Sequence, residues 1–275
     1  MLNPNSELAQ RFWEHGRLDD CPVIDFHGHM QEWRSCHMPR NSAEDMLKTM
    51  DECNVRLLLF CGHLTLHGLC SRHQFDIDAV RRHPTRLRAY FGLNGNSPDL
   101  KADFQRFLDN PDVFVGFKTL GGYFNIKLTD DRYAPFFEHA NAHKLPFLSH
   151  TWGNNPLDGH EEAARFMKKY PDIMFIAGHS FHGCWDEAAA LCADHPNLFL
   201  ELTAVFDERG PLERLLEKAG SERLLFGTDL PWFDTHHGIG TLLSTDMSDD
   251  DRHNILHRNG ERLLGKYPWF QQLNR

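Results

Sequence analysis

Short apolar runs alternate with amphipathic helical patterns along nearly the whole chain of 275 residues. Eight runs rich in β-branched and aromatic residues have the length of strands: 23–26, 55–61, 87–93, 113–118, 146–150, 173–179, 198–201 and 224–229. Eight helical patterns follow them: 43–51, 75–83, 100–110, 134–143, 161–170, 185–195, 211–219 and 249–264. Strands this short and apolar, each followed by a helix, require a parallel sheet that helices cover.

The number of these units predicts how the sheet closes. Eight strand–helix units in a chain of this length favour a closed (β/α)₈ barrel, the TIM barrel, over an open doubly wound sheet. The last helical pattern opens with Ser248 and three aspartates, a cap and an acidic first turn typical of a helix start. We therefore predict an α/β protein with one barrel domain over 1–275 and an extra helix over about 6–18.

Composition excludes several classes of partner. The formal net charge of −10 argues against a nucleic-acid partner, which a basic face would recognise. No run approaches membrane-spanning length, and the first residues lack the basic and apolar regions of a signal peptide, so we expect a cytoplasmic protein without a membrane partner. The seven cysteines are scattered without a Cys-x-x-Cys pair, which favours reduced thiols that mostly serve in packing.

A histidine pair closes the first predicted strand, in the segment Asp25-Phe26-His27-Gly28-His29. Side chains two residues apart on a strand share a face, so His27 and His29 can bind one cation. Polar residues with metal-binding or acid–base chemistry also end later strands: Lys118, His150, His179 and Asp229. The carboxyl ends of barrel strands form the rim where barrel active sites lie. The sequence therefore predicts one metal site at that rim.

These motifs resemble those of the amidohydrolase superfamily, in the amidohydrolase-related (amidohydrolase 2) branch that includes aminocarboxymuconate-semialdehyde decarboxylase. The resemblance rests on the segments 25–29, 116–118, 146–150, 177–179 and 225–232, and on 259–265, which looks like the family's last helix. It implies metal ligands at His27, His29, His150 and Asp229. It also implies that His179 orients the reacting water or the substrate, and it leaves room for a homo-oligomer.

The number of metal ions depends on Lys118. In binuclear amidohydrolases a carboxylated lysine on the fourth strand bridges two metals, and Lys118, His150 and His179 could do this here. Family members often have a histidine two residues after this lysine, whereas Leu120 stands there in this chain. We favour one divalent cation, zinc first and Mn²⁺ or Fe²⁺ as alternatives. Lys118 would then anchor the substrate or pair with a nearby carboxylate.

The predicted ligand set leads to an expected reaction. Three imidazoles and one carboxylate leave the cation with positive charge and room for water, as in catalytic zinc sites. Such a cation lowers the pKa of its bound water, which Asp229 could deprotonate while His179 polarises a substrate carbonyl. We therefore expect a hydrolase that cleaves a C–O or C–N bond of a small carbonyl compound, such as a lactone, ester or amide.

Two alternatives remain open. The same residues could serve a non-oxidative decarboxylase of a small unsaturated or aromatic carboxylic acid, with a cationic side chain to hold the carboxylate. The candidates for that role are Arg34, Arg40, Arg72 and Lys118. A barrel that binds a metal or ligand without turnover is the third reading, although no expected ligand is missing.

Further residues on the predicted rim could shape the site. The aromatic side chains Trp33, Trp152, Trp185, Trp232 and Phe233 follow strands one, five, six and eight and could form apolar walls. Glu201 ends the seventh strand and could accept a hydrogen bond from a ligating histidine. The loop histidines His63, His67, His182, His236 and His237 could contact the substrate, although solvated side chains are the simpler expectation.

Overall fold

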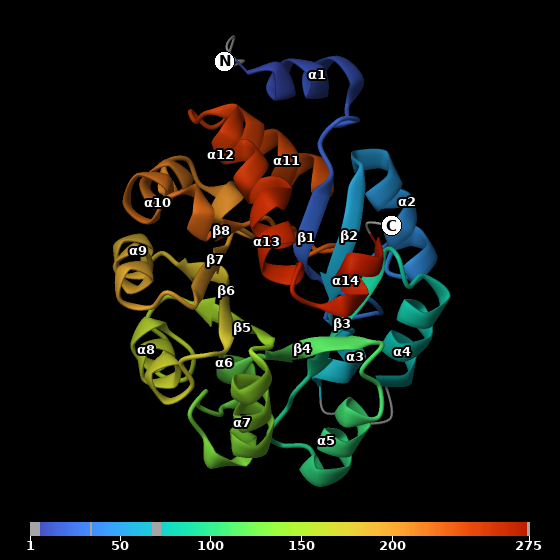
Figure 1. Cartoon of the computed structure of the whole chain (residues 1–275), viewed down its shortest axis with the longest axis vertical. Helices are drawn as coiled ribbons and strands as arrows, with labels where there is room; N and C mark the ends of the chain where they lie inside the picture. The colour runs from blue at the N-terminus through green and yellow to red at the C-terminus, as the bar shows by residue number, and fades with distance from the viewer. Residues whose placement is uncertain (1–5, 34, 68–72, 274–275) are drawn as a thin grey trace.

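The computed structural model describes residues 6–33, 35–67 and 73–273 and contains the predicted barrel (Figure 1). Its strands are β1 (Val23–Gly28), β2 (Val55–Phe60), β3 (Leu87–Gly92), β4 (Phe114–Thr119), β5 (Pro146–Trp152), β6 (Met174–His182), β7 (Leu198–Glu201) and β8 (Leu224–Leu225). They form one sheet in sequence order, and each neighbouring pair is parallel. The prediction of a TIM barrel is confirmed.

The barrel closes through the backbone that follows β8. The amide of His29 donates to the Leu230 carbonyl (2.6 Å), and the amide of Asp229 donates to the His27 carbonyl (2.7 Å). These bonds join the carboxyl end of β1 to the segment after β8. The first and last parts of the predicted metal site therefore lie side by side.

Helices surround the strands (Figure 1). Those between or after strands are α2 (Ala43–Cys53), α4 (His73–Arg82), α5 (Leu100–Leu108), α7 (Ala134–His143), α8 (His160–Lys169), α9 (Trp185–Asp194), α10 (Pro211–Ala219) and α11 (Thr235–Ser244). Short turns of helix are α3 (His63–Leu66), α6 (Gly121–Phe124), η2 (Asp131–Tyr133), η3 (Val205–Asp207) and η4 (Ser221–Arg223). The chain begins with α1 (Glu7–His15) and ends with α12 (Asp249–His253), the π-helical turn η5 (Asn254–Arg258), α13 (Asn259–Leu264) and α14 (Pro268–Leu273).

Three elements differ from their predicted form. The extra first helix is shorter than 6–18, because Gly16 ends it with a positive φ of 74°. The eighth strand stops at Leu225 instead of reaching residue 229. Helix α11 was not predicted, since two glycines dilute its helical pattern; the Asp234 side chain caps its first turn. At the last helix the predicted cap is confirmed, because Ser248 forms a capping box with Asp251.

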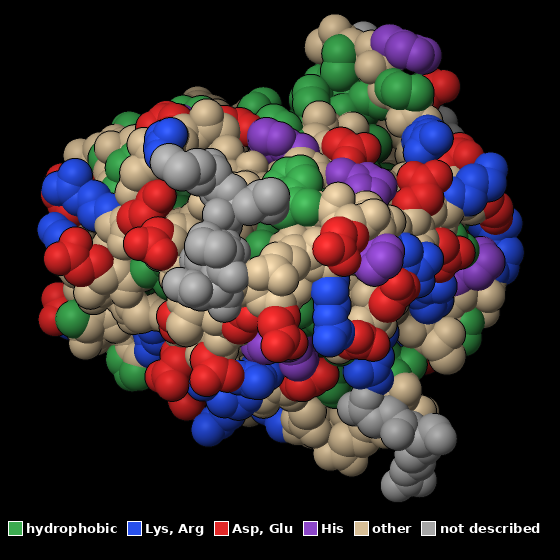
Figure 2. Space-filling model, turned by 90° about the horizontal axis from the view of Figure 1, so that it is seen from above, with side chains coloured by type: hydrophobic (Ala, Val, Ile, Leu, Met, Phe, Trp, Pro, Cys, Tyr) green, Lys and Arg blue, Asp and Glu red, His purple; other side chains and the backbone are tan. Residues whose placement is uncertain are grey.

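The core between sheet and helices is aromatic. Phe107 of α5 packs on Phe117 of β4 with ring centroids 4.4 Å apart, and Phe137 of α7 packs on Phe147 of β5 at 4.7 Å. On the outside, acidic and basic side chains are interspersed over the face shown in Figure 2. None of the described helices is both long and apolar enough to cross a membrane.

Candidate active site

The carboxyl ends of the strands surround one cavity of about 420 Å³. Every side chain predicted for the site lines it: His27, His29, Lys118, His150, His179 and Asp229. They come from the ends of β1, β4, β5 and β6 and from the segment after β8. Parallel strands that close into a barrel bring these distant positions to the same rim, as the sequence predicted.

The closest group of potential ligands consists of His27, His29 and Asp229. Asp229 Oδ1 lies 3.0 Å from His29 Nε2 and 3.3 Å from His27 Nε2. The three ligand atoms lie within 4.8 Å of one another. Asp229 Oδ1 is buried yet makes no hydrogen bond of acceptable geometry, and the same is true of His179 Nδ1. Buried polar atoms normally have a partner, so this donor set fits a cation.

Two more histidines extend this cluster along the cavity. The ring of His179 lies 5.1 Å from that of His27 and 4.7 Å from that of His150, between centroids. The ring of His179 therefore lies between those of His27 and His150. The predicted ligand His150 stands farther along the cavity, beside His179.

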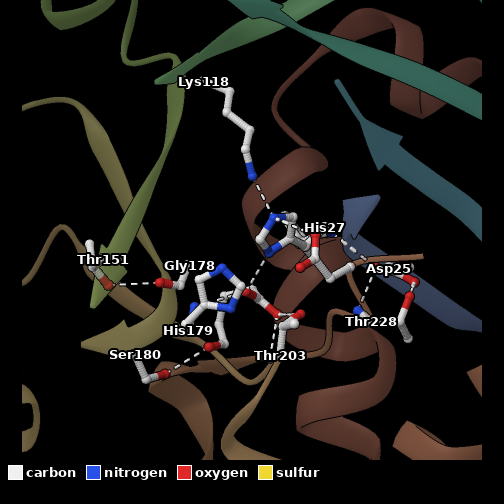
Figure 3. Close-up of polar contacts among 12 residues, drawn as sticks. Asp25, His27, Lys118, Thr151, Gly178, His179, Ser180, Thr203 and Thr228 are labelled. Carbon is white, nitrogen blue, oxygen red and sulfur yellow. Dashed lines mark hydrogen bonds and ion pairs between the residues drawn. The ribbon is translucent and has the colours of Figure 1, made fainter. Parts of the chain in front are cut away.

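A buried acceptor orients each of the two histidines at the end of β1, of which Figure 3 labels His27. His27 Nδ1 donates to Glu201 Oε2 (2.8 Å), and His29 Nδ1 donates to the Cys61 carbonyl (2.8 Å). Each imidazole is thereby held with its Nε2 lone pair toward Asp229. Metal-ligating histidines usually have such an acceptor behind them. Glu201 accepts the hydrogen bond from a histidine that its place at the end of β7 predicted.

Glu201 and Asp25 also fix the backbone of the rim. Glu201 accepts hydrogen bonds from the amide of His179 (3.2 Å) and the amide of Thr203 (2.6 Å). Asp25 accepts from the amide of His27 (2.9 Å) and the hydroxyl of Thr228 (2.5 Å). The two carboxyl groups thus connect β1, β6 and the segments that follow β7 and β8. Burial raises the pKa of Asp25 and of Glu201 to about 7.

The backbone at His179 adopts an unusual conformation. His179, Ser180 and Phe181 all have positive φ values, of 66°, 51° and 55°. Each costs free energy in a residue other than glycine, so neighbouring contacts must hold this segment. The Phe181 amide donates to the Thr151 hydroxyl (2.9 Å), and the Ser180 hydroxyl donates to the Glu201 carbonyl (2.7 Å). The strained segment is therefore fixed from both neighbouring strands (Figure 3).

Burial sets the charge of the cluster. It lowers the pKa of His27, His29 and His150, and it lowers that of His179 to about 3. These imidazoles are therefore neutral at physiological pH, which is the form that binds metals. Burial opposes ionisation of Asp229, but the histidines around it hold its pKa well below the usual range. The cluster thus offers neutral nitrogens and one carboxylate.

Lys118 contacts His27 at Nε2, the ring atom that Asp229 also approaches. Its Nζ lies against His27 Nε2, and the side chain is almost fully buried. Burial lowers the pKa of this lysine. Among the described residues that line the cavity, Lys118 is the sole lysine or arginine. It is thus the one lining side chain, within the described part of the chain, that could offer a cation to an anionic ligand.

Aromatic side chains form the upper walls of the cavity. Trp33, Trp152, Trp232 and Phe233 line it as predicted, and Tyr123 joins them. Trp33 and Trp232 pack edge to face with centroids 5.7 Å apart, while Trp152 stacks against His150 at 6.1 Å. Such walls suit a flat apolar ring above a polar floor.

His63 lines the cavity, on the face where the sequence placed it, but it is not solvated. It is buried, its ring stacks on His29 at 4.6 Å, and its Nε2 accepts a hydrogen bond from Trp232 Nε1 (2.9 Å). The expectation of a solvated histidine was therefore wrong. Its place in the short helix α3, directly after the end of β2, was the available signal.

Other residues named from the sequence lie elsewhere. Trp185 does not line the cavity; its ring packs on His182 at 5.1 Å. Arg40 is exposed and lies 3.4 Å from Glu52. Arg34 and Arg72 lie outside the described residues.

Comparisons with known proteins agree with this architecture. Over 250 residues the chain is 26% identical to a gamma-resorcylate decarboxylase from Polaromonas sp., covering 70% of this chain and 74% of that protein. A gamma-resorcylate decarboxylase from Rhodococcus jostii is 23% identical over 79% of this chain and 86% of its own length. The crystal structure of a dihydroxybenzoic acid decarboxylase from Polaromonas sp., with bound manganese and 2-nitroresorcinol, superposes with a TM-score of 0.70 at 18% identity, covering 93% and 98% of the two chains.

These relatives correct the expected reaction. The prediction of a hydrolase was wrong, because the similar proteins are decarboxylases, which favours the alternative reading of the same residues. The dihydroxybenzoic acid decarboxylase holds manganese, whereas zinc stood first in the prediction for this chain. The model of the amidohydrolase family matches residues 66–266. This chain therefore belongs to the amidohydrolase family, within the branch that the sequence motifs indicated.

Proposed function

We propose that this protein is a metal-dependent non-oxidative decarboxylase of a hydroxylated aromatic carboxylic acid. The observation that carries the proposal is the similarity to gamma-resorcylate decarboxylases over 70% and 79% of the chain. The cavity supports it, because aromatic walls stand above a floor of histidines and one aspartate. A substituted benzoate has the matching shape, with a flat ring and a charged group at one edge.

The metal site proposed here consists of His27, His29 and Asp229, with His150 and His179 beside it. One divalent cation fits this set of neutral imidazoles and one carboxylate, and Mn²⁺ stands with Zn²⁺ as the preferred ion. When bound, the cation would offset negative charge on the carboxylate and phenolic oxygens of the substrate. Glu201 would keep His27 oriented for this role through the contact at Nδ1.

The reaction needs one proton and no electrons. The bond between the ring carbon and the carboxylate breaks, carbon dioxide leaves, and the electron pair on the ring carbon forms a bond to a proton. Asp229 is our candidate to relay that proton from water to the ring carbon, because its side chain keeps 13% exposure while that of His27 has none. We assign Lys118 to hold an anionic oxygen of the substrate, and His179 to a polar contact with it.

The test is decarboxylation of a panel of acids by the metal-loaded protein. The panel contains 2,6-, 2,4- and 2,3-dihydroxybenzoate and salicylate, and the readouts are carbon dioxide release and the phenol formed. We expect turnover of at least one acid and a loss in kcat of about 10²–10⁴-fold for Asp229→Asn. Asp131→Asn is the matched control, because that side chain is 99% exposed.

One result would contradict the proposed reaction, and another would contradict the role proposed for Asp229. The first is a folded, metal-loaded wild type that releases no carbon dioxide from any acid of the panel. The second is an Asp229→Asn variant that turns over as fast as Asp131→Asn. In the second case the reaction would stand, but the role given to Asp229 would be wrong.

A further inference from the structure

A second group of ligand-type side chains lies at the opposite end of the barrel. Cys21 precedes β1, His253 ends α12, and His257 lies in the π-helical turn η5, which contacts β1 (Figure 1). Six residues of extended chain, roughly 20 Å, separate Cys21 from His27. This group is therefore separate from the candidate active site.

The distances within this group are close to those of a tetrahedral metal site, with the two histidine nitrogens about 0.3 Å nearer to each other. Cys21 Sγ lies 3.5 Å from His253 Nδ1, and His253 Nδ1 lies 3.0 Å from His257 Nε2. All three ligand atoms lie within 4.8 Å of one another. A tetrahedral zinc ion with bonds of about 2.3 Å to sulfur and 2.0–2.1 Å to nitrogen separates its ligand atoms by about 3.3–3.6 Å.

The local fold explains why these side chains converge. His253 and His257 are four residues apart, so successive helical turns place them on one face. The π-helical turn Asn254–Arg258 begins directly after His253, and such turns are frequent at functional sites. Cys21 reaches the same face from the start of β1, 232 residues earlier in the sequence.

A carboxylate lies beside one of these histidines. His257 Nδ1 lies 3.2 Å from Glu261 Oε1, which leaves His257 Nε2 toward His253 and Cys21. This contact is looser than the hydrogen bond of Glu201 with His27, because its geometry does not make a hydrogen bond. Cys21 is buried, while His253 and His257 are partly exposed, so an ion could enter from the helix side.

We propose that Cys21, His253 and His257 form a second metal site, for zinc or a similar thiolate-binding divalent cation. Thiolate and imidazole ligands select such ions over magnesium or calcium. Binding displaces the Cys21 thiol proton to solvent, forms the metal–sulfur bond and leaves a fourth position for water. The bound ion would tie the start of β1 to the carboxyl-terminal helices, and it takes no part in the proposed decarboxylation.

Cobalt(II) titration of the metal-free protein tests this proposal. Thiolate bound to cobalt gives a sulfur-to-metal charge-transfer band in the near ultraviolet, whereas the ligands proposed for the active site are nitrogen and oxygen alone. We expect this band in the wild type, its loss in Cys21→Ser and at least a tenfold weaker cobalt affinity in His257→Ala. Cys53→Ser is the matched control, because Cys53 is also a buried free thiol.

A double variant separates this test from that of the proposed function. His27→Ala with Asp229→Asn removes two of the three ligands proposed for the active site but should retain the charge-transfer band. Circular dichroism checks that every variant folds. The proposal is overturned if folded wild type shows no charge-transfer band at saturating cobalt, or if the band survives Cys21→Ser. Neither result depends on whether the protein decarboxylates anything.

Discussion

The two ends of the barrel hold two histidine clusters of different construction. At the carboxyl end, His27 and His29 stand on or next to a buried strand, and buried acceptors hold both rings. At the amino end, His253 and His257 stand on a helix and remain partly exposed. The first cluster lines a cavity of about 420 Å³, while the second lies between β1 and the last helices. The first arrangement suits chemistry on a ligand, and the second suits an ion that ties the start of β1 to the last helices.

The two clusters obtain their geometry in different ways. Strand positions two apart share a face without any help, and the barrel rim adds residues from other strands. Helical positions four apart also share a face, but Cys21 meets them through packing of distant segments. We therefore expect the carboxyl-end cluster to be the more rigid of the two, and the predictions below test that contrast.

The largest effect is expected where the carboxyl-end cluster is packed most tightly. A Cβ at Gly227 would lie 2.1 Å from Glu201 Oε1 and 2.9 Å from the Cβ of His27. Gly227→Ala should lower the free energy of unfolding by about 3 kcal/mol, the upper part of the range for overpacking, because neither neighbour can move without losing its contacts. Chemical denaturation measures the change.

Gly240→Ala in α11 is the control for that substitution. Its new Cβ would meet the nearest atom, in Trp13, at 3.5 Å, an ordinary contact distance. Because alanine is the better helix former, we expect a gain of roughly 0.5–1 kcal/mol. Equal losses of stability in the two variants would show that the carboxyl-end cluster is no more rigid than a surface helix.

The next effect concerns the carboxylates behind the two clusters. Glu201→Gln keeps the shape but weakens the acceptor for His27 Nδ1, so metal affinity at the active site should fall about 10–100-fold. Glu261→Gln at the other end should weaken cobalt binding less, because the Glu261 side chain is 37% exposed and water can replace it. Metal titrations of both variants, followed calorimetrically, measure the ratio. A larger loss for Glu261→Gln would reverse the contrast between the clusters.

Much of the carboxyl-end site could be predicted from the sequence because its information is local. The spacing of His27 and His29 places both side chains on one face of the first strand. Lys118, His150 and His179 end other strands, so the barrel brings them to the same rim. Glu201 was visible for the same reason. The hydrolase prediction failed because the same ligands serve both reactions, and the choice rests on loop geometry that no spacing reveals.

Other features were invisible for physical reasons. The eighth strand stops at Leu225, and four residues later Asp229 takes a positive φ of 58°. The amino-end cluster depends on a π-helical turn and on Cys21, which composition alone assigns to packing. His63 becomes a wall of the cavity through a stack on His29 that only the folded chain creates.

The smallest effect is expected at the rim, where the carboxyl-end cluster meets its aromatic walls. Trp232→Phe keeps a ring in the wall but removes the hydrogen bond from Trp232 Nε1 to His63 Nε2 (2.9 Å). The Trp232 side chain is 41% exposed, so water can replace part of this contact. A hydrogen bond of about 0.5–1.5 kcal/mol corresponds to a rise in KM of roughly 2–12-fold. Steady-state kinetics with the best acid of the panel measures KM and kcat separately.

An unchanged kcat would mean that His63 positions the substrate as part of the wall. A fall in kcat at constant KM would contradict this role for His63. It would mean that His63, which lies in α3 and stacks on His29, belongs to the reacting cluster.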